Sequence, residues 1–263
     1  MNAVKIKNNV SEHLEVLKRN EVRLLLAMSE LQLKYLFHVL KNGEETDFEK
    51  VLRGYTTIVS RMKSIPGFEE NNEEWQSALA SVRELLNTSA DMGCFSADAM
   101  NILSPFLSLA GMMPEVKHEW FGCFCYNYVP ERRHIYLHFR NACVPESPFV
   151  AIGDRFKELG MIVKDIQNKE LKPETIGCDS WLNELEVFQS FFPPGYSDSF
   201  VVSPPDSKAG YGWWGQFVGK DGRFNTSKAA RFEKEMKFQY RRMITKCSYE
   251  SFVRNIEDKL RKR

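Results

Sequence analysis

The sequence has no long apolar segment and no excess of charge of either sign. None of its apolar runs approaches the ~18 residues that a membrane-spanning helix needs, and the first 20 residues are too polar for a signal peptide. Its 36 Lys and Arg nearly balance its 35 Asp and Glu, so charge gives no argument for binding a nucleic acid or a membrane. We therefore expect a cytoplasmic protein that acts on a small molecule. The sequence does not indicate its oligomeric state.

The six cysteines lack the spacing of a zinc site. No CxxC pair and no Cys/His cluster occurs, and the closest pair, Cys123 and Cys125, is separated by one residue. The chain also has no glycine-rich loop with the spacing of a Walker or dinucleotide-binding motif. In a cytoplasmic protein the thiols are expected to be reduced, and we predict no bound metal.

Hydrophobic residues, by contrast, are plentiful. They make up 43% of the chain, and 19 of them are phenylalanines, which is enough for a sizeable core. Up to about residue 110 the apolar residues mostly recur at intervals of three and four, which indicates amphipathic helices. The pattern predicts helices near 11–42, 47–65 and 72–89, and a helical domain over residues 1–112.

The pattern changes after Met112, and we place the domain boundary within 112–120. Strand-forming residues at 120–129 and 134–139 predict an antiparallel hairpin. A helix near 149–167, a strand at 174–182, a helix at 183–192, a second hairpin at 213–225 and helices near 227–238 and 248–261 follow. The predicted class is therefore α+β: an N-terminal helical bundle, then a mixed-sheet α/β domain over 113–263.

The strand "HIYLHFR" carries a row of polar side chains on one face. Alternation along a strand places His134, Tyr136, His138 and Arg140 together, and the intervening apolar residues in the core. One interpretation is a pocket wall with a histidine base, Tyr136 as an acid and Arg140 binding an anion. The other is a half-exposed strand whose polar face meets water. Cys123 and Cys125 could add thiols for a metal across the hairpin, although cysteine is commonly a buried hydrophobe.

The stretch "GCDSWL" ends the next predicted strand. Cys178 is a candidate nucleophile only if a base such as His134 or His138 lies nearby in space. Asp179 at the strand end could orient a histidine or bind an amine, since ligands bind at strand ends in α/β sheets. Its alternative role is that of a turn or N-cap aspartate.

The loop at 207–217, "SKAGYGWWGQF", interleaves glycines and aromatic residues. As a mobile flap it would close over a substrate and offer Tyr211, Trp213 and Trp214 as a stacking surface. As a tight packed hairpin it would have no such role.

Residues 134–196 resemble the GNAT-like domains of acyltransferase-like proteins. The resemblance lies in a strand that ends in His-Phe, a helix, and a strand reading Cys-x-Ser-Trp-Leu, with His138, Cys178, Ser180, Trp181 and Leu182 as the matching residues. It implies a twisted mixed sheet whose two central strands diverge to admit the pantetheine arm of an acyl-CoA donor. In that family a glycine-containing turn holds the coenzyme pyrophosphate at a helix start. Here the corresponding segment 140–148 begins with Arg140, the candidate coenzyme-binding residue, and contains no glycine.

The favoured function is acyl transfer from a thioester to an amine. His134 or His138 would take the amine proton, Tyr136 or Cys178 would protonate the leaving thiolate, and Asp179 would position the amine. One alternative is a Cys/His or metal-assisted enzyme that uses the same pocket. Another is a non-catalytic ligand-binding or interaction protein.

Overall fold

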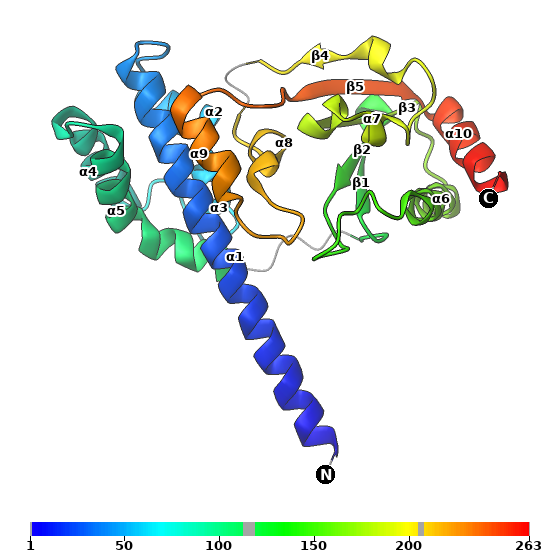
Figure 1. The fold of residues 1–263 in the computed structure, drawn as a ribbon, viewed down its shortest axis with the longest axis horizontal. Coiled ribbons are helices and arrows are strands. Elements are labelled where there is room, and N and C mark those ends of the chain that lie inside the picture. The colour runs from blue at the N-terminus through cyan, green and yellow to red at the C-terminus, as the bar shows by residue number, and fades with distance from the viewer. Residues whose placement is uncertain (1, 113–118, 205–207, 263) are drawn as a thin grey trace. The chain divides into compact units, whose positions relative to one another are not determined.

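The computed structural model of the chain describes residues 2–112, 119–204 and 208–262, and the side chains from residue 19 onward. By backbone contacts it divides into two compact units (Figure 1). The first consists of helices, and the second is built on a five-stranded mixed sheet. The predicted α+β class, with a helical N-terminal region and a mixed sheet, is confirmed. Most of the predicted boundary segment, residues 113–118, lies outside the described residues.

The first unit is held together by the C-terminal half of its longest helix, α1. Buried residues of α1 recur from Leu25 to Val39. Its neighbour α5 approaches closely at Gly111, where a Cβ would lie 3.1 Å from the Val22 Cα. A late segment of the chain, α9, also belongs to this unit, and its Phe232 ring packs 5.4 Å from that of Tyr35. The helices are α1 (Asn2–Lys41), α2 (Phe48–Tyr55), α3 (Ile58–Met62), α4 (Glu73–Thr88), α5 (Met92–Met112) and α9 (Thr226–Glu235).

The second unit contains one sheet with the strand order β1-β2-β3-β5-β4. The β1–β2 hairpin is antiparallel, as predicted, and β3 is parallel to β2 after a crossover through α6. On its other side β3 pairs antiparallel with β5, and β4 pairs antiparallel with β5. The strands are β1 (Phe124–Val129), β2 (His134–Phe139), β3 (Thr175–Ser180), β4 (Val201–Val202) and β5 (Met243–Ser248).

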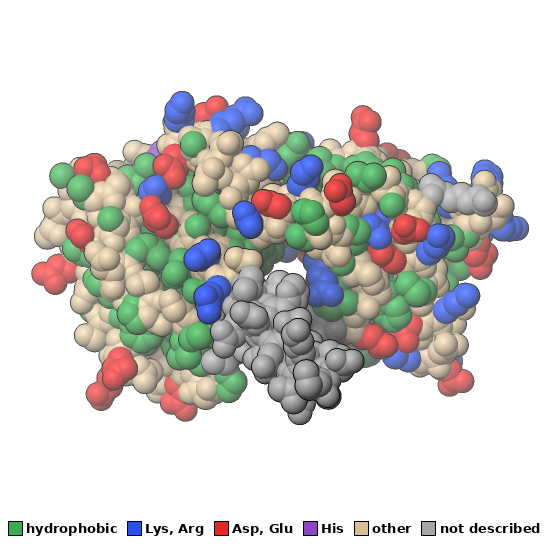
Figure 2. Space-filling view, turned by 60° about the horizontal axis from the view of Figure 1, so that its bottom comes forward, with side chains coloured by type: hydrophobic (Ala, Val, Ile, Leu, Met, Phe, Trp, Pro, Cys, Tyr) green, Lys and Arg blue, Asp and Glu red, His purple; other side chains and the backbone are tan. Residues whose placement is uncertain are grey.

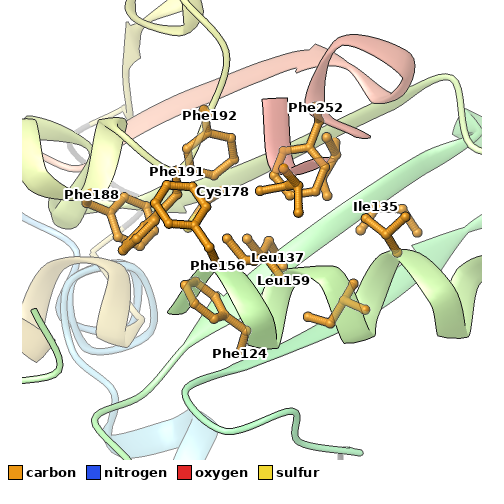
Figure 3. Packing of buried hydrophobic residues seen from close by; sticks show 14 of the residues in the cluster. Phe124, Ile135, Leu137, Phe156, Leu159, Cys178, Phe188, Phe191, Phe192 and Phe252 are labelled. Carbon is orange, nitrogen blue, oxygen red and sulfur yellow. The ribbon is translucent and has the colours of Figure 1, made fainter. Parts of the chain in front are cut away.

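One face of this sheet is covered by α6 (Ile152–Asn168) and α10 (Tyr249–Arg261). The strands contribute Ile135, Leu137 and Ile176 to the shared core. Figure 3 shows that phenylalanine rings surround the centre of this core, and several of them meet edge to face. Aromatic pairs prefer this geometry, so the phenylalanine-rich composition is used mainly to close this face of the sheet.

Two predicted elements of the second unit are wrong. Residues 213–225 do not form the two predicted strands: they begin with the end of α8 (Tyr211–Trp214) and a 3-10 turn, Gly215–Phe217, and only single bridge residues, Val218 and Phe224, flank the predicted turn. Trp213, Trp214 and Phe217 are all buried, and burial at i, i+1 and i+4 suits a helical turn, whereas strand alternation would expose one of two consecutive tryptophans. The helix predicted at 183–192 is only α7 (Glu186–Gln189), preceded by the 3-10 turn Trp181–Glu184.

Figure 2 shows acidic and basic side chains interspersed on one face of the molecule, in keeping with the net charge of +1. Within the described residues, no helix combines the length and the apolar character that crossing a bilayer requires.

Candidate functional site

Strands β2 and β3 pair with each other over only half their length. The paired residues are His134 with Thr175, Ile135 with Ile176, and Tyr136 with Gly177. In the described strands, residues 137–139 of β2 and 178–180 of β3 are not paired with each other, although all six residues of β3 pair with β5. The two parallel strands therefore diverge toward their C-terminal ends, which is where ligands bind in sheets of this kind.

The structure brings His138 and Asp179 to this divergence. Each lies two residues beyond the last pair, Tyr136 and Gly177, so both occupy equivalent positions on the same face of the sheet. The His138 side chain is exposed, and the Asp179 side chain is 25% exposed. The two titratable groups thus lie at the divergence, on neighbouring strands.

Asp179 is held by the elements that pack at the end of β3. Arg242, directly before β5, places a guanidinium nitrogen 3.5 Å from the carboxylate. The backbone of α8 lies against the same residue, since a Cβ on Gly212 would be 2.9 Å from the Asp179 carbonyl oxygen. Burial raises the pKa of Asp179, and Arg242 only partly opposes this. A carboxylate with a raised pKa is a better proton acceptor than an ordinary surface aspartate.

His134 and Tyr136 lie on the same face but in the paired half of β2. His134 is buried, and its Nδ1 lies 2.8 Å from the Thr175 hydroxyl. Burial, followed by the charges of Lys246 and Arg132, lowers the pKa of His134 and keeps the ring neutral. His134 and His138 are four residues apart, which along a strand is roughly 13 Å. His134 therefore lies well away from His138. Tyr136 lies between the two histidines, and its hydroxyl accepts a hydrogen bond from Arg132 at 3.2 Å.

Cys178 is not brought together with either histidine. Strands β2 and β3 are neighbours, but their register places Cys178 on the opposite face of the sheet from His134 and His138. Its side chain is 4% exposed and lies among the phenylalanine rings of the core (Figure 3). Burial raises the pKa of its thiol to about 12. Such a thiol is inert at neutral pH, so the position favours a packing role.

The structure does not bring the predicted coenzyme-binding residue Arg140 and the predicted stacking residues into one common contact. Arg140 stacks its guanidinium 4.0 Å from the centre of the Trp120 ring. Trp213 and Trp214 both pack against Phe238, with ring centroids 5.1 and 5.0 Å away. They are used in a packed cluster and present no stacking surface. Tyr211, at the start of α8, is 38% exposed.

The two closely spaced cysteines do not share a face. A left-handed turn at Gly122 places Cys123 before β1, and its side chain joins the core with that of Phe124. Cys125 points to the other face, in register with His138. Among the residues that the structure describes, no group of three or more His, Cys, Asp or Glu side chains is arranged to hold a metal ion.

Two residues that shape the site were not identified from the sequence. Asn183 is fully buried, and its amide donates to the carbonyl oxygens of Cys178 and Met243 at 2.6 and 2.8 Å, which ties together the ends of β3 and β5. Arg242 is the ionic partner of Asp179. The alternation in "MITKCS" is the signal that indicates β5, and recognising that strand would have placed Arg242 at its start.

Comparison with known proteins adds no assignment: no family model, curated protein or solved structure matches this chain.

Proposed function

We propose that the chain transfers an acyl group from a thioester to an amine, with the reaction centred where β2 and β3 diverge. The observation that carries the proposal is the partial pairing of these strands, which stops after Tyr136 and Gly177. Two central parallel strands that separate in this way are what the resemblance to GNAT-like domains implies for the entry of a pantetheine arm. The β2–α6–β3 crossover and the antiparallel strands on either side also agree with that arrangement.

The side chains at the divergence suit the chemistry. An amine must lose a proton as it attacks a thioester carbonyl, and the thiolate that leaves must gain one. His138 is placed to accept the amine proton, and Asp179 to hold the amine in position. Tyr136, one step back on the same strand face, is the candidate donor to the thiolate. In this assignment the new amide bond forms as the thioester C–S bond breaks, and the amine proton leaves on His138.

The start of α6 offers a place for the phosphates of a coenzyme. Ala151 at the N-cap has no side chain that could accept from the first amides of the helix, and such amides attract anions. Against this, Asp154 lies in the first turn and segment 140–148 contains no glycine. The thioester part of the proposal therefore has stronger support than binding of the nucleotide part.

No observation favours the Cys/His or metal-assisted alternatives. Cys178 is in the core and away from both histidines. No metal-binding cluster lies among the described side chains.

Turnover by the full chain tests the proposal. Acetyl-CoA would be incubated with a panel of primary amines, and the free thiol that is released would be measured against an enzyme-free blank. We expect amine-dependent thiol release, which His138→Gln should lower by roughly 100-fold or more if His138 is the general base. Lys246→Gln, an exposed change on the same face of β5, is the matched control and should retain turnover. Equal turnover in wild type and His138→Gln would remove His138 from the mechanism.

A further inference from the structure

A pair of thiols lies outside the proposed site, next to a buried ion pair. The Sγ atoms of Cys123 and Cys143 are 3.8 Å apart. Cys123 is fully buried before β1, whereas Cys143, in the loop between β2 and α6, is partly exposed. A disulfide has an S–S distance of about 2.05 Å, so a side-chain movement of less than ~2 Å would bring the sulfurs into bonding distance.

Arg155 and Glu158 of α6 hold this pair in place. The guanidinium donates to both carboxylate oxygens of Glu158, at 2.8 and 2.5 Å, and to the Pro148 carbonyl at 3.0 Å. Its Nη1 also lies 2.9 Å from Cys143 Sγ. Glu158 in turn accepts from the Cys123 backbone N–H at 3.0 Å. One buried ion pair thus anchors the backbone of one cysteine and the sulfur of the other.

Gly122 makes this anchoring possible. Its φ is +62°, and a Cβ at this position would collide with the Glu158 carboxylate. The local chain is therefore built to bring the Cys123 N–H and the Glu158 carboxylate together.

The geometry points to a reversible redox site, in which Cys143 and Cys123 form an intramolecular disulfide with hydrogen peroxide as the oxidant. The partly exposed Cys143 sulfur attacks a peroxide oxygen: the O–O bond breaks, Cys143 becomes a sulfenic acid and one water leaves. The Cys123 sulfur then attacks the Cys143 sulfur, the S–S bond forms, the S–O bond breaks and a second water leaves. Overall, two thiols lose two electrons and two protons, and the peroxide is reduced to two waters.

The surroundings of each cysteine decide which one attacks the peroxide and which one then attacks the sulfenic acid. Arg155 is a fixed donor that stabilises negative charge on the Cys143 sulfur during the attack. Cys123 has no exposed surface, so it meets no oxidant directly and serves as the resolving thiol. Burial raises the pKa of Cys123 to about 11, which is consistent with an unreactive resting thiol. The inference is independent of the proposed acyl transfer.

Thiol counting on the full chain tests the inference. The reduced protein is treated with a small excess of hydrogen peroxide, denatured, alkylated and analysed by intact-mass and peptide mass spectrometry. We expect the six thiols to fall to four, with a loss of about 2 Da that a dithiol reductant reverses and a crosslinked peptide joining Cys123 to Cys143. Six remaining thiols, or a bridge between other cysteines, would overturn the inference.

Conservative variants separate the two roles. In Cys123→Ser the Cys143 sulfenic acid has no resolving thiol and should be captured by dimedone, whereas Cys143→Ser should show neither a bridge nor dimedone labelling at Cys123. Cys94→Ser, at the exposed cysteine, is the matched control and should still lose two thiols. Dimedone labelling of Cys123 in Cys143→Ser would reject the assigned order of attack.

Discussion

His138 and Asp179 face the same side of the sheet from equivalent positions on β2 and β3, two residues beyond the point where these parallel strands stop pairing. A histidine and a carboxylate whose pKa is raised by burial therefore lie on neighbouring strands at the divergence. The buried amide of Asn183 donates to the carbonyl oxygens of Cys178 in β3 and Met243 in β5, and so links these two strands near the divergence. Such a local departure from regular pairing is typical of sites with a function.

A bulky side chain at the divergence should weaken the ligand binding that we propose there. His138→Trp places a large ring at the divergence, and we expect the Kd for acetyl-CoA to rise by roughly 10-fold or more. Lys246→Trp adds the same ring on the same face of the sheet, opposite Gly177 in the paired half of β3, and its affinity should match that of wild type. Isothermal titration calorimetry measures both. Equal affinities in the two variants would place the ligand elsewhere.

Cys178 should be dispensable for catalysis. Because its thiol lies in the core with a pKa of about 12, native protein at neutral pH should not be alkylated there. The exposed Cys94 should react faster than Cys178, although its hydrogen bond with Asp91 raises its pKa. Cys178→Ala should keep near wild-type turnover and cost about 1 kcal/mol of unfolding free energy through lost packing. If Cys178 is alkylated rapidly in the native protein, or if Cys178→Ala is folded but inactive, Cys178 would again be a candidate nucleophile.

The Arg155–Glu158 pair, which holds the two cysteines in place, should also contribute to the unfolding free energy of the protein. Both side chains are nearly buried, at 5% and 11% exposed, so Glu158→Gln leaves an unbalanced buried guanidinium. Breaking such a pair costs about 3–5 kcal/mol, which urea unfolding would register. Lys157→Gln removes a partner from the exposed Lys157–Asp154 pair in the same helix and should cost less than about 1 kcal/mol. Similar losses in both variants would contradict the buried role of Glu158.

His134 should make stability depend on pH. Its folded-state pKa lies below its ordinary value of about 6.5, so the unfolded chain binds the proton more readily. The stabilisation is therefore complete above about pH 6.5 and is lost as the pH falls from there toward the folded-state pKa. The unfolding free energy should decrease as the pH falls below about 6.5, and His134→Asn should flatten this decrease. An unchanged slope in the variant would mean that other groups cause it.

The strand β2 illustrates what the sequence can predict. Alternation alone places Ile135 and Leu137 in the core, and they are 0% and 2% exposed. Alternation fails at Cys123, because the left-handed backbone at Gly122 interrupts the strand before β1 begins. It also fails at Trp213 and Trp214, where turn formation and aromatic packing outweigh strand propensity.

The site was less predictable than the fold because it depends on register. Whether Cys178 or Asp179 shares a face with the histidines is decided by the pairing of β2 with β3, and a shift of one residue would reverse the answer. The ion pair of Asp179 with Arg242 joins residues 63 positions apart. Local patterns contain no information on either relationship, whereas the predicted helix near 149–167 depended only on its own periodicity and was confirmed.

The most direct measurement of the central claim is the thermal midpoint of the full chain with and without acetyl-CoA and longer acyl-CoAs. A ligand at about 100 times its Kd adds ~2.7 kcal/mol to stability, which for a domain of this size raises the midpoint by several degrees. We expect this rise with acyl-CoAs in wild type and its loss in His138→Trp. No shift with any thioester would contradict acyl transfer at the divergence of β2 and β3.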